Sequence, residues 1–146
     1  MKVGPVLVVE DSDEDFMAFE WAMRKLGRTD RVLRCLDGDD ALDALFGRGP
    51  YTEAVWPSLV LLDLNLPGTD GREVLAELKA TPTLRRVPVV VLSTSINPRD
   101  VAACYQSGVN SYMLKPVNFE KYTEQLGRLF EFWLGVAVLP EAPVEA

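Results

Sequence analysis

Three short apolar runs in this chain each end in charged side chains, and this pattern restricts the folds that the chain can adopt. The runs, each with the charge that follows it, are 6–9 with Glu10 and Asp11, 59–62 with Asp63, and 112–114 with Lys115. Adjacent carboxylates repel one another and raise one another's pKa, so a strand that ends in them is unfavourable unless a cation lies there. The pattern therefore predicts a cation site at the ends of buried strands.

The remaining sequence alternates between strand and helix patterns. Strands are expected at 6–10, 31–36, 59–62, 87–92 and 112–115, and helices at 13–26, 39–46, 72–79, 99–106 and 119 to about 133. Five such units predict an α/β fold with a doubly wound parallel sheet and helices on both faces. Ligands in these folds bind outside the carboxyl ends of the strands. Glu10, Asp11, Asp63, Ser93 and Lys115 all fall at such ends.

Composition limits the classes of function. With 146 residues, of which 48% are hydrophobic, we expect one globular domain. A net charge of −7 argues against binding to nucleic acid or to an anionic membrane. No apolar stretch is long enough for a signal peptide or a membrane span, so we expect a cytoplasmic protein. Cys35 and Cys104 fit no metal spacing, and buried free thiols are expected.

The chain contains no histidine, which excludes a Ser-His-Asp or Cys-His mechanism and a histidine-bound zinc. It also means that the chain cannot carry a phosphohistidine. A metal at the carboxylates would be bound by oxygen, which favours Mg²⁺, with Mn²⁺ as the alternative. Structural roles stay open for single residues: Asp11 as a helix cap, Lys115 as a surface lysine and Tyr112 as half-buried packing.

Four motifs together resemble the receiver domain of two-component response regulators, over residues 6 to about 133. They are Val9-Glu10-Asp11, Leu61-Leu62-Asp63-Leu64-Asn65-Leu66-Pro67-Gly68, Val89-Val90-Val91-Leu92-Ser93-Thr94 and Tyr112-Met113-Leu114-Lys115-Pro116. The resemblance implies a flavodoxin-like (βα)5 sheet in the order 2-1-3-4-5. We expect a receiver domain at 1–133, followed by an apolar extension and a disordered tail at 134–146, without an output domain.

The resemblance also implies a role for each site residue. Asp63 is the expected phosphoacceptor, and Glu10, Asp11, Asp63 and the backbone carbonyl of Asn65 are the expected magnesium ligands. The remaining roles are those of Ser93 as switch hydroxyl, Lys115 as active-site lysine, Tyr112 as aromatic switch, and Asn65 and Ser95 as residues that tune the phosphoryl lifetime. A cis peptide bond before Pro116 is expected as well.

A regulator of this kind is not an enzyme in the ordinary sense. We expect it to accept a phosphoryl group from a sensor histidine kinase, to react with small phosphodonors, and to dephosphorylate slowly. Three further motifs resemble the regulators that accompany bacterial phytochromes, which makes a phytochrome kinase a candidate partner. These motifs are Val9-Glu10-Asp11-Ser12, Val91-Leu92-Ser93-Thr94-Ser95-Ile96-Asn97 and Phe132-Trp133-Leu134. A phosphate shuttle and a phosphorylation-independent pseudo-receiver are the alternatives within the family.

Two other classes would place functional residues at the same strand ends. An FMN-binding flavodoxin should have a phosphate loop rich in Gly, Ser and Thr after the first strand, but residues 10–15 are mostly acidic and would repel phosphate. A haloacid-dehalogenase-like phosphatase places a second aspartate two residues after its nucleophile, whereas this chain has Asn65 there.

The end of the chain is unusually apolar for a segment beyond a core helix. Trp133, Leu134, Val136, Val138 and Leu139 follow one another closely before Pro140. Exposed apolar runs often mark interfaces. We therefore expect a homodimer that buries this segment through a two-fold contact, with folding back onto its own domain as the alternative. Met17 and Trp21, off the core stripe of the first helix, are candidates for a partner contact.

Overall fold

The computed structural model describes residues 3–143 as a parallel five-stranded sheet in the order β2-β1-β3-β4-β5, covered by helices on both faces. The strands are β1 (Val6–Val9), β2 (Val32–Cys35), β3 (Leu59–Asp63), β4 (Val89–Ser93) and β5 (Ser111–Leu114). The helices are α1 (Asp13–Lys25), α2 (Gly38–Phe46), α3 (Gly71–Ala80), η1 (Leu84–Arg86), α4 (Pro98–Gln106), α5 (Phe119–Phe130) and η2 (Glu131–Val136). The predicted doubly wound, flavodoxin-like fold and its strand order are confirmed.

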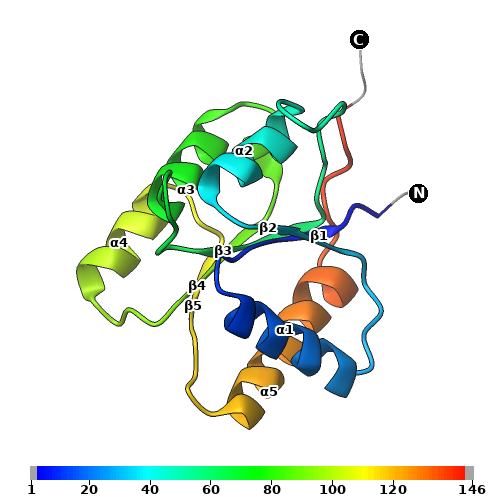
Figure 1. Cartoon of the computed structure of the whole chain (residues 1–146), viewed down its shortest axis with the longest axis vertical. Coiled ribbons are helices and arrows are strands. Elements are labelled where there is room, and N and C mark those ends of the chain that lie inside the picture. Colours follow the sequence, from blue (N-terminus) through cyan, green and yellow to red (C-terminus); the bar gives the residue numbers. More distant parts are fainter. Residues whose placement is uncertain (1–2, 144–146) are drawn as a thin grey trace.

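Two apolar layers hold the helices on the sheet (Figure 1). Helices α1 and α5 cover one face, and α2, α3 and α4 cover the other. Alternate residues of β1 contribute to the two layers: Leu7 packs with the α2 and α3 side, and Val8 packs with the α1 and α5 side. Strands β1, β3 and β4 are buried along nearly their whole length, as expected for the central strands of a parallel sheet.

The register of the sheet sets the predicted strand ends side by side. Val9 pairs with Leu62, and Ser93 pairs with Leu114, so the residues that follow lie at one edge of the sheet. The backbone N–H of Lys115 donates to the carbonyl of Ser93 at 2.9 Å, which continues this pairing by one residue. Parallel pairing therefore places Glu10, after β1, and Lys115, after β5, at the same edge of the sheet, although they are 105 positions apart in sequence.

The start of α1 is fixed by Ser12, whose side chain is the N-cap and accepts a hydrogen bond from the N–H of Asp15 at 3.2 Å. The N-cap of α1 is therefore Ser12, a residue type that is favoured at this position. The alternative that Asp11 caps this helix is wrong. The carboxylate of Asp11 stays available at the edge of the sheet.

The Lys115–Pro116 bond differs from the prediction. Residues 3–143 contain no cis peptide bond, so the expected cis bond before Pro116 is wrong. Lys115 is directed towards the site by the β4–β5 pairing that extends to its own N–H.

The end of the chain also departs from the predicted pattern. Helix α5 ends at Phe130 and continues as the π-helix η2, so the helical segment extends to Val136 rather than to about Trp133. Trp133 and Leu134 pack against the α1–α5 layer. Beyond η2 the chain runs back past the start of β1 (Figure 1), and the indole N–H of Trp56 reaches the carbonyl of Pro140 at 3.5 Å.

The prediction of a disordered tail covers 140–146, of which 144–146 lie outside the described residues. Within residues 3–143, no helix combines the length and the apolar character that a membrane crossing requires.

Candidate functional site

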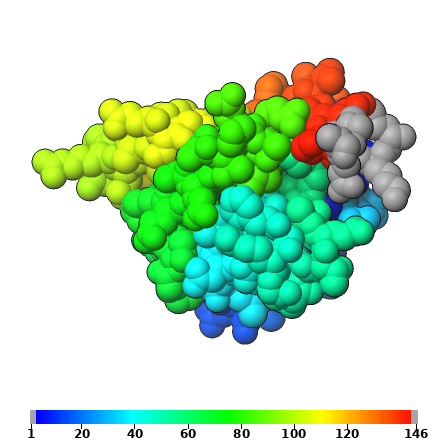
Figure 2. Space-filling model, turned by 90° about the horizontal axis from the view of Figure 1, so that it is seen from above, coloured from blue at the N-terminus to red at the C-terminus, as the bar shows by residue number. Residues whose placement is uncertain are grey.

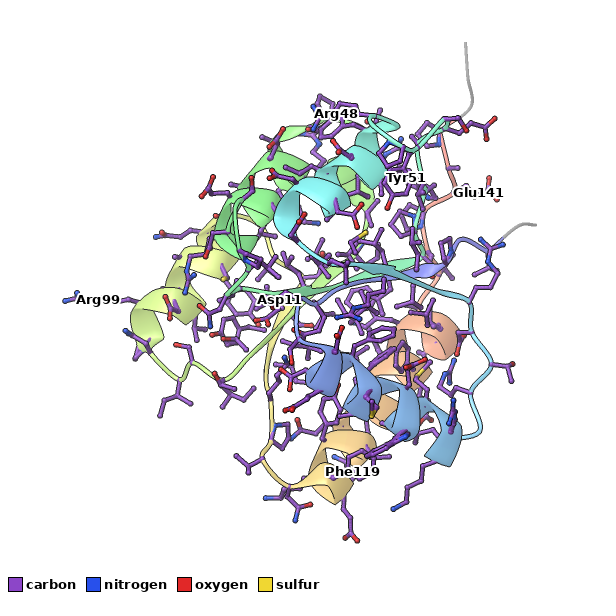
Figure 3. All side chains as sticks on the ribbon, in the orientation of Figure 1. Asp11, Arg48, Tyr51, Arg99, Phe119 and Glu141 are labelled. Atoms are coloured by element: carbon purple, nitrogen blue, oxygen red, sulfur yellow. The ribbon has the colours of Figure 1, made fainter. Side chains whose placement is uncertain are left out.

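Three carboxylates meet at the carboxyl edge of the sheet. Glu10 and Asp11 follow β1, Asp63 ends β3, and one carboxylate oxygen from each lies within 4.8 Å of the other two. Glu10 is only 5% exposed, Asp63 is partly buried, and Asp11 is exposed. Figure 3 shows Asp11 between the sheet and α1. The prediction that these three residues converge is therefore confirmed by their geometry.

Lys115 supplies the positive charge of this cluster. Its Nζ lies 2.8 Å from Oε1 of Glu10, 3.3 Å from Oδ2 of Asp15 and 3.7 Å from Oδ2 of Asp63. The lysine side chain is largely buried, which is inconsistent with the alternative of an ordinary surface lysine. The ammonium group thus hydrogen-bonds to Glu10 at the end of β1 and to Asp15 of α1, and Asp63 at the end of β3 lies somewhat farther away.

Burial and pairing act in opposite directions on these groups. Burial raises the pKa of Glu10, and the hydrogen bond from Lys115 partly offsets that effect. For Lys115, burial alone would lower the pKa, but the hydrogen bond to Glu10 and the charge of Asp63 raise it above the ordinary lysine value. Lys115 is therefore a permanent cation at physiological pH.

The donor set fits a hard divalent cation. All three acidic groups offer oxygen, and a buried carboxylate such as Glu10 with two carboxylates close by gains from a compact double positive charge. Lys115 alone balances one of the three negative charges. Bound Mg²⁺ or Mn²⁺ would therefore compensate the negative charges of this cluster better than Lys115 does alone.

Ser93 ends β4, and Tyr112 lies on the neighbouring strand β5. Ser93 is 1% exposed and its Oγ accepts a hydrogen bond from the N–H of Ser95 at 3.1 Å. The hydroxyl of Tyr112 donates to the carbonyl of Ser95 at 2.9 Å, so its ring is turned towards the β4–α4 loop. Ser93 and Tyr112, the two predicted switch residues, therefore both hydrogen-bond to Ser95 in the β4–α4 loop. Thr94 is exposed, so Ser93 is the hydroxyl that faces inward.

The two predicted lifetime residues occupy different positions. The N–H of Asn65 donates to Oδ1 of Asp63 at 3.2 Å, directly at the expected acceptor. The hydroxyl of Ser95 instead donates to Asp100 at 2.6 Å, and Asp100 also pairs with Arg72. Hydrogen bonds from Ser95 and Arg72 lower the pKa of Asp100.

Sequence reasoning missed two residues around the site. Asp15 contacts Lys115, and Arg34 donates from Nε to the carbonyl of Glu10 at 3.0 Å while pairing with Asp13 at 2.8 Å. A contact of Arg34 could have been predicted from the sequence, because a charged side chain within a short strand beside β1 needs a partner. Asp15 gave no comparable signal, because acidic residues are common in the first turn of any helix.

A groove of about 330 Å³ opens beside Lys115. It lies between α1 and the segment that joins β5 to α5, and its lining is mostly apolar: Asp15, Ala18, Thr94, Lys115, Pro116, Val117, Phe119 and Tyr122. Asp15 and Lys115 are the charged residues of its lining.

A doubly wound (βα)5 sheet whose carboxyl edge carries a lysine and three carboxylates places the chain among the α/β proteins that use this edge as a site, and the carboxylate oxygens fit a divalent cation. The model of the response regulator receiver domain family matches residues 6–126. The chain belongs to this family. Its members are signalling phosphoacceptors rather than ordinary enzymes, as expected from the sequence.

Individual relatives share most of the chain. Response regulator Rcp1 of Synechocystis sp. is 41% identical over 137 residues, which are 94% of this chain and 93% of Rcp1. The crystal structure of the Mn²⁺-bound form of Rcp1 has a TM-score of 0.87 with 40% identity and covers 94% of this chain and 99% of that one. The phosphorylated cyanobacterial phytochrome response regulator RcpA has a TM-score of 0.89 with 42% identity, covering 96% of this chain and 100% of RcpA.

Proposed function

We propose that this protein accepts a phosphoryl group on Asp63 from a sensor histidine kinase, with Mg²⁺ or Mn²⁺ as cofactor. Glu10, Asp11, Asp63 and the backbone carbonyl of Asn65 would hold the metal. The observation that carries the proposal is the position of Asp63 between two acidic neighbours and the Nζ of Lys115, 3.7 Å away. The Mn²⁺-bound structure of Rcp1 supports the metal, and the phosphorylated structure of RcpA supports the phosphoryl group.

The chemistry follows from the charges at the site. An oxygen of Asp63 forms a bond to phosphorus while the phosphorus–nitrogen bond of the donor phosphohistidine breaks and its electron pair returns to the imidazole nitrogen. Bound metal would screen the repulsion between the carboxylate and the phosphoryl oxygens. Lys115 would donate to a phosphoryl oxygen as a compact charge. The same arrangement supports phosphorylation by small donors and slow hydrolysis.

The switch residues would transmit the new charge to α4. A phosphoryl group on Asp63 offers the Ser93 hydroxyl a charged acceptor to which it can donate, whereas in its contact with the N–H of Ser95 the same hydroxyl oxygen accepts. Movement of Ser93 would displace the β4–α4 loop and the contact of Tyr112 with it. Helix α4 has one buried residue, Cys104, and projects from the body of the molecule (Figure 2), so little packing opposes a shift.

The partner would be a kinase of the bacterial phytochrome type. RcpA is described as a phytochrome response regulator, and the bacteriophytochrome response regulator AtBRR is 37% identical with a TM-score of 0.75, covering 97% of this chain. The exposed pair Met17 and Trp21 lies on α1, the helix that contributes Asp15 and Ala18 to the groove, and would contact the kinase. Phosphotransfer from an ATP-dependent kinase would take place in the cytoplasm, and the signal would pass through protein contacts.

The apolar extension would join two copies of the chain. Val136 and Val138 are 68% and 98% exposed, while Trp133, Leu134 and Leu139 are partly buried against their own domain. The exposed members would be covered by the same segment of a second copy in a two-fold contact. Folding back accounts for the partly buried members of the segment, and the dimer accounts for the rest.

The experiment is a phosphotransfer profile. The wild type and Asp63→Asn are incubated with each phosphorylated histidine kinase of the host, and the early transfer of label is measured. We expect rapid transfer from a phytochrome kinase to the wild type and none to the variant. Equal transfer to both proteins would refute Asp63 as acceptor. Transfer only from an unrelated kinase would refute the phytochrome partner while leaving the acceptor intact.

A further inference from the structure

Asp15 is the site residue whose position has no role in the proposed chemistry. It lies in the first turn of α1, its side chain is 54% exposed, and its Oδ2 is 3.3 Å from the Nζ of Lys115. Its backbone N–H is bound to the side chain of Ser12, which fixes the turn and keeps the carboxylate over the site. Asp15 borders both the cavity around Asp63 and the groove beside Lys115.

The distances show which carboxylates hold Lys115. Its ammonium is 2.8 Å from Glu10 and 3.3 Å from Asp15, but 3.7 Å from Asp63, which lies beyond hydrogen-bond length. Lys115 is therefore held towards β1 and α1 rather than at the acceptor. A phosphoryl group on Asp63 would have to draw Lys115 away from the two carboxylates that it now contacts.

Asp15 differs from the other carboxylates in one respect. Glu10, Asp11 and Asp63 have oxygens that converge within 4.8 Å and form the expected metal set, and Asp15 is outside that group. A divalent cation would engage Glu10 and so weaken its hold on Lys115. Asp15 would then be the remaining carboxylate that competes with the phosphoryl group for the same ammonium.

We propose that Asp15 is a positioning residue that acts through Lys115: it retains the ammonium away from Asp63 and so weakens the binding of a phosphoryl group there. The proposal rests on the proposed function of Asp63. A partly exposed ion pair is weak, so the effect should be about two- to fivefold in affinity. Its direction is distinctive, because removing this charged residue should improve the site.

The test measures the affinity for beryllofluoride, a phosphoryl mimic that binds a receiver aspartate, at saturating Mg²⁺. Asp15→Asn should bind beryllofluoride about two- to fivefold more tightly than the wild type. Asp15→Glu, which keeps a carboxylate within reach of Lys115, should be close to the wild type. Glu14→Gln removes the same charge from the neighbouring exposed position and is the matched control. It should also be close to the wild type.

The affinity for Mg²⁺ alone separates positioning from metal binding. Asp15→Asn should match Glu14→Gln in this measurement, because Asp15 is not among the converging ligands. Weaker Mg²⁺ binding by Asp15→Asn than by the control would overturn the proposal. If Asp15→Asn fails to fold in a melting experiment, Asp15→Ser, with a small polar side chain, takes its place.

The outcomes keep the two proposals apart. If wild-type protein binds no beryllofluoride with Mg²⁺, the proposed function fails. If the wild type binds it and Asp15→Asn binds as Glu14→Gln does, or more weakly, only the role of Asp15 fails.

Discussion

Magnesium should stabilise the folded protein, because the proposed site brings three carboxylates together. Oxygens of Glu10, Asp11 and Asp63 lie within 4.8 Å of one another. At an effective dielectric constant of about 20, two full charges at that separation repel by about 3.5 kcal/mol. Lys115 offsets part of this repulsion for Glu10 and Asp63, whereas the exposed Asp11 has no comparable contact with it.

The gain from binding follows from mass action. The metal binds the native site and not the unfolded chain, so at a concentration 100-fold above the dissociation constant it adds about 2.7 kcal/mol to the free energy of unfolding. For a chain of this length, each kcal/mol corresponds to roughly 2–4 °C in melting temperature. We therefore expect the melting temperature to rise by about 5–11 °C at that concentration.

Differential scanning calorimetry over a series of Mg²⁺ concentrations measures this rise. Asp11→Ala should lose most of it, and without metal it should melt at or slightly above the wild-type temperature, because one repulsive charge is gone. Glu14→Ala, which removes an exposed charge outside the cluster, should keep the full rise. An equal rise in the wild type and Asp11→Ala would refute the assignment of the site.

Three further results are expected. Bulky or charged replacements of Asn65 and Ser95 should change the rate of dephosphorylation more than that of phosphorylation, and unchanged decay of label in both variants would contradict their role. Removing residues 134–146 should convert a dimer into a monomer in light scattering, and a monomeric full chain at high concentration would exclude the dimer. The buried thiols of Cys35 and Cys104 should react with Ellman's reagent only after unfolding. Burial raises the pKa of both thiols, that of Cys35 to about 12. Rapid reaction in the native protein would contradict this expectation.

The main features of the fold and the site could be predicted because they depend on strand ends. A buried parallel strand is recognisable as an apolar run, and parallel pairing places all carboxyl ends at one edge. Asp63 and Lys115 could therefore be assigned to one site although they lie on different strands. Register, which the sequence pattern does not specify, was needed to turn this expectation into contacts such as the 2.8 Å pair of Lys115 and Glu10.

The features that were missed depend on tertiary contacts. The π-helix η2 and the 3₁₀-helix η1 have no distinct composition, and the return of the chain to Trp56 depends on a contact of residues 84 positions apart. Asp15 has the ordinary composition of a first helical turn, and only the distance to Lys115 distinguishes it from Glu14. Helix propensity predicts that Glu14 and Asp15 lie in the first turn of a helix. Only the packed structure shows which side chain each of them contacts.

The central claim is that Asp63 carries the phosphoryl group in a magnesium-dependent reaction. The most direct measurement is to phosphorylate the wild-type chain with acetyl phosphate and Mg²⁺, trap the acyl phosphate by reduction with borohydride, and locate the modified residue by peptide mass spectrometry. The account predicts modification of the peptide that contains Asp63, only when Mg²⁺ is present. Modification at another aspartate, or equal modification in the presence of a chelator, would contradict it.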